Sequence, residues 1–305
     1  VASPGQKLYV AGTCRGVNPV LEGGVTLSQT LFLSKSLTIQ GGYSTDNWSV
    51  PHPVTQITTL DAAGLGRVVV ITHSAAVSIS GLYLRGGYAD QGGGLLVAGG
   101  ALTMAGNGVV SNTASQGGAL YVQDGLVSLY AGNQLYGNQA GEGAGIYNAG
   151  GQITLDNNLL RDNQASAGGA FYHAAGSSLV QNCVLRQNTA TNGAAFYNAA
   201  GDGLVARHNT LYANSATNGG GFYNAAGSPT LVNSLLISNT ASSGHAIFST
   251  VAFSQSYNDA FPAAGAYAGV SPGVGSLFVD PQLVEIGDGY FRLADDSPVI
   301  DRGDP

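Results

Sequence analysis

The segment NTASQGGALY at residues 112–121 returns in altered form as NQAGEGAGIY at residues 138–147, and four further versions follow it. Each version begins with Asn, has Ala two places later and Gly five places later, and ends with an apolar residue and then an aromatic one. Such a fixed interval marks a repeat architecture. The leading asparagines recur every 25 or 26 residues: Asn112, Asn138, Asn163, Asn188, Asn214 and Asn239.

Each period contains three short apolar segments separated by Gly, Asn, Ser or Thr, and none of them has a helical pattern. An aliphatic residue three places before each Asn forms a predicted core column: Val109, Leu135, Leu160, Leu185, Leu211 and Leu236. Three strands per period fit a coil that rises by about 4.8 Å, one strand spacing, whereas a propeller blade needs about 40 to 45 residues. We therefore predict an all-β fold, a single-stranded right-handed parallel β-helix of about seven coils, because crossovers between parallel strands are right-handed.

The strict period covers only part of the chain. We assign residues 1–80 to N-terminal coils and a cap, with a loop inserted at 41–59, and residues 81–250 to the regular repeats. Residues 251–305 are rich in Pro, Asp and Tyr, so we assign them to irregular coils and a cap that covers the last open strand edges.

The Asn column is expected to form a structural ladder. Asn tolerates the left-handed backbone region of a tight turn, and its amide can bond to its counterparts in the coils above and below. Cys183 interrupts a second such column and is predicted to be a buried structural thiol, too far from Cys14 for a disulfide. The second column contains Asn107, Asn133, Asn158 and Asn209, with Cys183 and Ser234 in the same register.

Two columns are candidate surface-binding stripes. Tyr136, Arg161, Arg186 and Tyr212 lie next to the Leu column and should face outward, where they suit an acidic glycan or a partner surface. The alternative for them is a solvated face on which Arg packs against Tyr.

A second candidate stripe follows the Phe/Ile column and should point away from the core, since side chains alternate along a strand. An exposed aromatic stripe suggests glycan stacking or subunit contact, although a turn that lets both columns be buried is the alternative. Its members are Tyr121, Tyr147, Tyr172, Tyr197 and Tyr223.

Several functions find no support in the sequence. The net charge is −7 and the ten basic residues are scattered, so nucleic acid is not an expected partner. No apolar run suits a transmembrane segment, and the five histidines have no metal-ligand spacing, so we predict no metal and no cofactor. Asp156 and Asp162 have no carboxylate in their columns in the neighbouring coils, so no catalytic residue is predicted; calcium binding by the Asp-rich tail stays open.

The repeats resemble those of polymorphic outer membrane proteins and of right-handed parallel β-helix proteins exported by environmental bacteria. The units that carry the resemblance are GGALY at 117–121 and GGGFY at 219–223, each preceded by Asn-x-Ala. Residues 37–43 look like the entry coils of the environmental proteins, and residues 297–305 look like their closing motif. The resemblance implies an extracellular or cell-surface location on a bacterium.

Our leading interpretation is a non-catalytic structural or adhesive module, with a glycan or cell-surface ligand as its partner or with self-association into an extracellular fibre or sheath. The alternative is a secreted polysaccharide lyase or hydrolase. Enzymes of that β-helical kind place two or three carboxylates on one face of adjacent coils.

Overall fold

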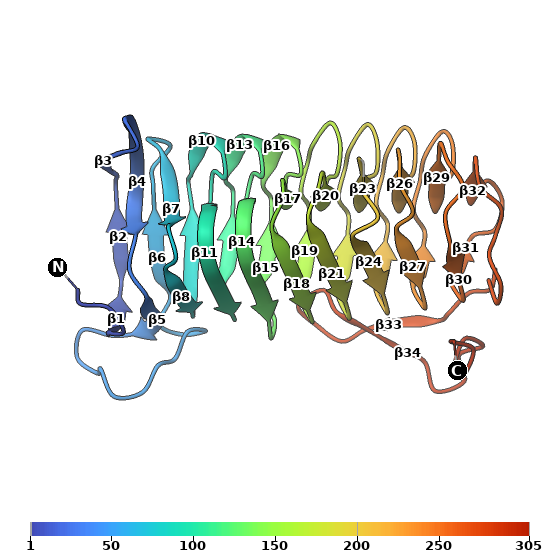
Figure 1. The fold of residues 1–305 in the computed structure, drawn as a ribbon. Coiled ribbons are helices and arrows are strands. Elements are labelled where there is room, and N and C mark those ends of the chain that lie inside the picture. The colour runs from blue at the N-terminus through green and yellow to red at the C-terminus, as the bar shows by residue number, and fades with distance from the viewer. Residues whose placement is uncertain (1, 200, 305) are drawn as a thin grey trace.

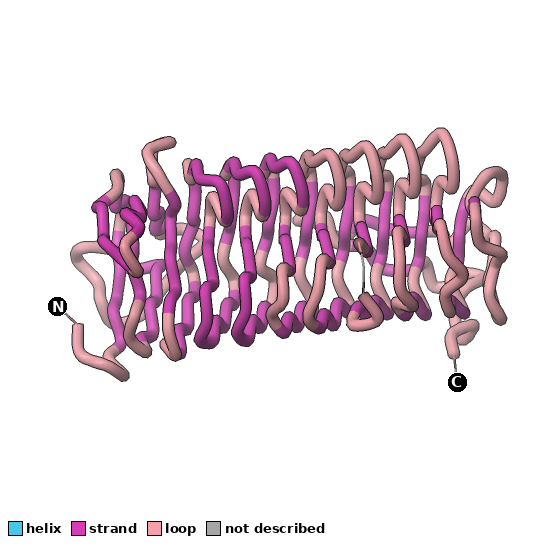
Figure 2. The backbone as a smooth tube through the Cα atoms, turned by 45° about the horizontal axis from the view of Figure 1, so that its top comes forward, coloured by secondary structure: helices cyan, strands magenta, loops and turns pink. Residues whose placement is uncertain are grey.

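The computed structural model describes residues 2–199 and 201–304, which wind into one elongated stack of coils (Figure 1). The N-terminus lies near one end of the rod and the C-terminus near the other (Figure 2). Strands from successive coils pair side by side in parallel and form three faces along the rod, and the described residues contain no helix. The fold is therefore an all-β parallel solenoid, as predicted.

The first and second faces belong to one 19-stranded sheet, because two long strands run unbroken through the bend between the faces. These are β11 (Leu95–Ala105) and β14 (Leu120–Tyr130). The first face also contains β4 (Val25–Leu33), β7 (Arg67–Thr72), β17 (Ile146–Asn148), β20 (Phe171–His173), β23 (Phe196–Asn198), β26 (Phe222–Asn224), β29 (Ile247–Ser249) and β32 (Tyr267–Ala268). The second face contains β1 (Lys7–Ala11), β5 (Leu37–Tyr43), β8 (Ala76–Ser80), β18 (Gln152–Asp156), β21 (Ser177–Gln181), β24 (Leu204–Arg207), β27 (Thr230–Val232) and β30 (Gln255–Ser256).

The third face is a separate ten-stranded sheet. It has more strands than the seven predicted coils because the irregular coils at both ends also contribute to it. Its strands are β2 (Thr13–Arg15), β6 (Thr58–Asp61), β9 (Leu82–Arg85), β12 (Gly108–Val110), β15 (Gln134–Tyr136), β19 (Leu159–Arg161), β22 (Val184–Arg186), β25 (Thr210–Tyr212), β28 (Leu235–Ile237) and β31 (Asp259–Phe261).

Three smaller groups of strands complete the fold. The turns between the third and first faces pair in parallel through β10 (Tyr88–Gln91), β13 (Thr113–Gln116) and β16 (Gln139–Glu142). The strand β3 (Asn18–Glu22) makes an antiparallel hairpin with β4, and β33 (Leu283–Glu285) makes one with β34 (Phe291–Leu293). Between β5 and β6, residues 44–57 form a loop without a named strand, visible at the lower left of Figure 1.

The core consists of the predicted columns. The aliphatic column from Val109 to Leu236 is buried on the inner side of the third face, with no member more than 1% exposed. Phe171, Phe196 and Phe222 fill the opposite side from the first face, and each is fully buried. Stacked apolar columns therefore bury a continuous interior along the rod.

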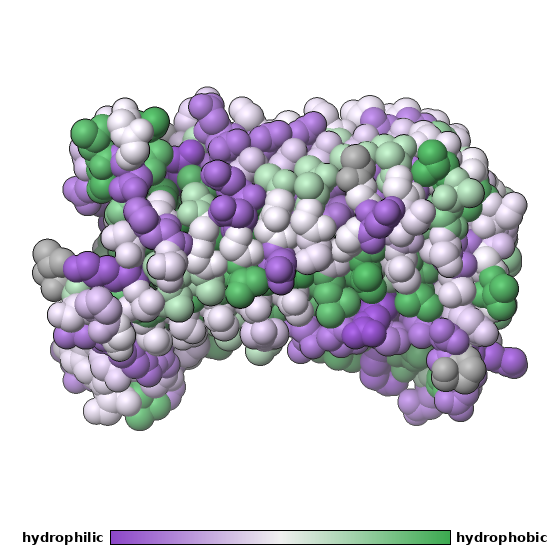
Figure 3. Space-filling view, viewed as in Figure 1, coloured by the Kyte–Doolittle hydropathy of each residue, from purple (hydrophilic) through white to green (hydrophobic). Residues whose placement is uncertain are grey.

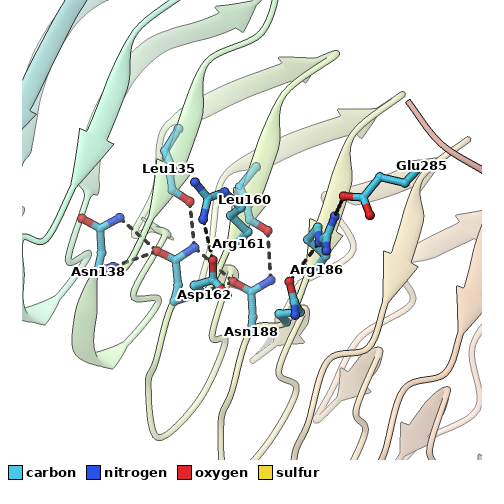
Figure 4. Close-up of polar contacts among 10 residues, drawn as sticks. Leu135, Asn138, Leu160, Arg161, Asp162, Arg186, Asn188 and Glu285 are labelled. Carbon is cyan, nitrogen blue, oxygen red and sulfur yellow. Dashed lines mark hydrogen bonds and ion pairs between the residues drawn. The ribbon is translucent and has the colours of Figure 1, made fainter. Parts of the chain in front are cut away.

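All six asparagines of the ladder are buried and bond to one another in series. Figure 4 shows the part of this series between Asn138 and Asn188. In one step, Asn138 Nδ2 donates to Asn163 Oδ1 at 2.9 Å, and the same oxygen accepts the Asn138 backbone N–H at 3.1 Å. Each Nδ2 also donates to a core carbonyl, as Asn163 does to Leu135 at 2.9 Å. The ladder thus satisfies buried backbone groups that the turns leave without a strand partner.

The predicted backbone conformation of the ladder was wrong by one residue. The left-handed residue is the one before each Asn, with φ between 53° and 63°, and not the Asn itself. The physical reason is that the left-handed residue turns the chain so that the next side chain points inward, where its amide can stack. The residues in this position are Ser111, Gly137, Asp162, Gln187, Ala213 and Ser238.

The C-terminal segment also departs from the predicted cap. Its first part continues the coils through β30, β31 and β32, and a second ladder extends to Asn258, which the lost period had hidden. From about residue 280 the chain turns back and β33 and β34 run beneath the rod (Figure 1). The tail lies there because outward apolar residues of the third face, Leu159 and Val184, need cover: they are 0% and 6% exposed.

Replacement of Asn163 by Ala should destabilise the protein by about 2–4 kcal/mol, because it leaves the buried Asn138 donors without an acceptor. Urea unfolding measures this effect. Gln164→Ala at the neighbouring exposed position is the control and should change stability by less than about 0.5 kcal/mol. Equal effects of the two substitutions would contradict a stabilising role for the ladder.

Candidate binding surface

The tyrosine column points away from the main core, but it is not an exposed stripe. Tyr121, Tyr147 and Tyr172 are only 6–8% exposed, and Tyr197 and Tyr223 are half-buried. Their rings stack with centroids 4.7–5.2 Å apart, and the first four pack together in a second apolar cluster with Val70 and Leu96. Burial raises the pKa of Tyr147 to about 12. The exposure predicted for the first three tyrosines was therefore wrong.

The turns between the third and first faces cover these rings. Ala167 lies in one such turn and packs against the tyrosine cluster. Gly168 has φ 65°, and a Cβ added to it would lie 2.8 Å from the Tyr172 Cβ. The repeated Gly is thus required both by its backbone conformation and by the close approach of the turn to the ring.

The Tyr/Arg column lies on the outer side of the third face, as its position beside the Leu column predicted. Tyr136, Arg161, Arg186 and Tyr212 are directly paired neighbours in β15, β19, β22 and β25. The Arg161 guanidinium lies 4.2 Å from the ring centroid of Tyr136, and that of Arg186 lies 5.9 Å from Tyr212. These are cation–π contacts on a half-buried surface. Whether this column binds a ligand stays a prediction.

The returning tail covers one half of this column. Arg186 forms an ion pair with Glu285 of β33 at 2.7 Å (Figure 4), and the ring of Phe291 lies 4.8 Å from that of Tyr212. Gly289 approaches both Leu159 and Arg186 closely. Arg186 and Tyr212 therefore bind the protein's own tail in this structure.

The other half stays open, and we call it the saddle. It is formed by the outward side chains of β6, β9, β12, β15 and β19, among them Asp61, Tyr83, Arg85, Val110, Tyr136 and Arg161. Loop 44–57 stands at one end of it and the β33–β34 hairpin at the other, and the lower outline in Figure 3 is hollowed between these two projections.

Two cavities mark the ends of the saddle. One has a volume of about 660 Å³ and is lined by Ile57, Asp61, Tyr83, Arg85 and Tyr136 among others. The other, of about 240 Å³, lies between Arg161 and the hairpin. The ring of Tyr83 packs against Gly108, where a Cβ would come within 2.8 Å of the ring. A side chain at position 108 would displace this ring.

Three arginines of the third face, in β9, β19 and β22, are each neutralised by a carboxylate. Arg85 binds Asp61 at 3.0 Å and Arg161 binds Asp162 at 2.6 Å, as Arg186 binds Glu285. Asp61 is 7% exposed, and its other oxygen accepts the backbone N–H of Ala63. The saddle therefore offers aromatic faces and fixed polar groups with little net charge.

Asp156 and Asp162, the two carboxylates weighed as catalytic candidates, are engaged in structural contacts. Asp156 accepts hydrogen bonds from Asn182 at 2.8 Å and Gln181 at 2.9 Å, and these bonds lower its pKa. Asp162 holds Arg161. Among residues 2–199 and 201–304 no group of three His, Cys, Asp or Glu side chains suits a metal ion, and no helix is long and apolar enough to cross a membrane.

The three stacked faces and the internal amide ladder define the chain as a parallel β-helix protein. The family model described as Right handed beta helix region matches residues 93–260, so the chain belongs to this family. No curated protein and no solved structure matches the chain.

His173 occupies the position that Asn148 and Asn198 hold in the adjacent coils, and it is fully buried. Burial lowers its pKa to about 4, and its Nδ1 lies 3.1 Å from Ser178 Oγ. In the unfolded chain the imidazole has a pKa of about 6.5. Acidification from about pH 6.5 to pH 4 therefore protonates the unfolded state selectively and lowers stability.

Between pH 7 and pH 4.5 the wild type should lose about 2–3 kcal/mol of stability through His173. The His173→Asn variant should not show this part of the loss. The measurement is the free energy of unfolding in urea at the two pH values. His52→Asn in the exposed loop is the control and should leave the wild-type pH dependence unchanged. A pH dependence that is identical in wild type and His173→Asn would contradict the burial of a neutral imidazole.

The two thiols should differ in reactivity. Cys183 is 1% exposed, burial raises its pKa to about 12, and its Sγ donates to the Gln181 carbonyl, whereas Cys14 is exposed. The thiolate is the reactive form. We expect an aromatic disulfide reagent to titrate one thiol per chain in the native protein and both after unfolding. Rapid native reaction of the Cys14→Ser variant would contradict this assignment.

Proposed function

We propose that the chain is a non-catalytic adhesive module of the bacterial surface or extracellular space that binds a neutral polysaccharide in the saddle. The observation that supports this most directly is the open pair of rings, Tyr83 and Tyr136, beside polar groups held rigid by ion pairs. Aromatic rings of Tyr offer large contact area at small entropic cost, and one polar end remains for hydrogen bonds.

The charge of the saddle favours a neutral polymer over the acidic glycan of our first hypothesis. Each arginine of the Tyr/Arg column already has a carboxylate partner. An acidic polymer would have to displace these carboxylates and would meet a chain of net charge −7. A neutral polymer can use the outer faces of the rings and leave the ion pairs intact.

The engaged carboxylates support a binding role rather than cleavage. Glycoside hydrolysis needs two carboxyl groups about 5 to 9.5 Å apart on either side of the scissile bond. In the saddle, Asp61 is buried against Arg85, and Asp162 pairs with Arg161. Assembly into a fibre remains compatible with this role, since the rod leaves the saddle on its side.

Replacement of Tyr136 by Ala should weaken polysaccharide binding about tenfold or more, because a central aromatic anchor is lost. Affinity electrophoresis or a pull-down with insoluble neutral polymers measures this. Tyr130→Ala, on an exposed ring outside the saddle, is the control and should bind like the wild type.

Added salt distinguishes the polymers, since ionic contacts weaken with screening and ring stacking does not. Binding to neutral polymers should be independent of salt, and no new reducing ends or unsaturated products should appear. Failure of every neutral polymer to bind, or undiminished binding by Tyr136→Ala, would overturn the proposal.

A further inference from the structure

The tail borders a third cavity, away from the saddle, over the last coils of the third face. Its volume is about 390 Å³, and we call it the tail pocket. Thr210, Leu235 and Asp259 line it from β25, β28 and β31, while the tail contributes Val299 and Arg302 among others. The cavity is within the size range of small-ligand sites.

Asp259 is the unusual member of its column. The preceding positions in the third face are Val184, Thr210 and Leu235, so the fold does not require a carboxylate there. Asp259 is only 2% exposed, and its Oδ1 accepts the Val279 backbone N–H at 3.1 Å. Its Oδ2 is buried and has no hydrogen-bond partner among the described residues.

An unpaired buried acceptor costs about 1–3 kcal/mol, so its presence beside a cavity needs an explanation. A ligand that donates a hydrogen bond would satisfy this oxygen. Because Oδ2 has almost no accessible surface in this structure, such a bond requires the Asp259 side chain to rotate toward the pocket, and rotamer changes of this kind are common on binding. The pocket wall combines polar groups, such as the Thr210 hydroxyl and the Asn233 amide, with the apolar side chains of Leu277 and Leu293. This mixture suits a molecule with hydroxyl groups on an apolar ring.

We propose that the tail pocket is a binding site for an uncharged sugar unit, one hydroxyl of which donates a hydrogen bond to Oδ2 of Asp259. Arg302 and Asp304 both line the pocket and offset one another, and a sugar hydroxyl can donate to Asp259 without adding charge. The site shares no residue with the saddle and does not depend on the function proposed for it.

The protonation of Asp259 should control affinity. Burial raises its pKa to about 6, and an ionised carboxylate is the stronger acceptor. Sugar binding should therefore be tighter at pH 7.5 than at pH 5, and bound sugar should lower the pKa of Asp259. The other titratable groups at or near this carboxyl are His208, Tyr257, Tyr267, Asp280, Arg302 and Asp304.

The test is calorimetric titration of the whole chain with methyl α-glucoside, methyl α-galactoside, methyl α-mannoside and N-acetylglucosamine at both pH values. We expect at least one probe to bind with a stoichiometry of one, about fivefold or more tighter at pH 7.5. Asp259→Asn should weaken this binding about tenfold and abolish its pH dependence. Asp296→Asn, on an exposed side chain of the tail, should behave like the wild type.

A second variant, Val299→Trp, fills the pocket from the tail without altering the coils, and should block binding even if Asp259→Asn folds poorly. Urea unfolding confirms that each variant is folded. Absence of binding by all four probes, or binding that survives both substitutions, would overturn the tail pocket. Tyr136→Ala should leave sugar binding to the tail pocket intact. The experiments therefore distinguish a failure of the saddle proposal from a failure of the tail-pocket proposal.

Discussion

The stacked amides of the Asn ladder are the constraint on which the rest of the structure depends. A coil of 25 or 26 residues must turn sharply between faces, and each turn buries backbone groups that no strand can pair. The ladder supplies both donor and acceptor from one side chain, in the same place in every regular coil. Because the ladder fixes the register of the coils, the Leu and Phe columns are aligned from coil to coil. The outward residues of the third face are aligned in the same way and form a continuous surface.

One part of that surface is covered by the protein's own tail, and the other part is open to solvent. The tail occupies the half that contains Arg186 and Tyr212, and the saddle remains open beside it. The ion pairs hold the arginines in place over the rings, which prearranges the surface and reduces its net charge. A rigid scaffold with a shallow, nearly neutral groove fits recognition of a long, flexible polymer better than it fits chemistry on a single bond.

The structural features formed by repeating residues were predicted from the sequence, and those formed by residues that do not repeat were missed. The Asn and Leu columns and the outward Tyr/Arg column were evident from spacing alone, because each uses one residue type in a fixed place. The left-handed position was missed because Ser111, Gly137 and Asp162 have nothing in common as side chains. The tail contact was missed because Arg186 and Glu285 are 99 residues apart, although Leu159 and Val184 in outward positions were a signal that something covers them.

The ladder also has a direction. In every step from Asn112 to Asn239 the Nδ2 donates to the Asn Oδ1 of the coil that follows, while the second Nδ2 hydrogen goes to a core carbonyl of the coil that precedes. The amide dipoles are therefore aligned head to tail and polarise one another, as bonds in a chain do. The rod consequently has an electrical polarity along its axis, and a coil inserted in the wrong register would interrupt this alignment as well as the packing.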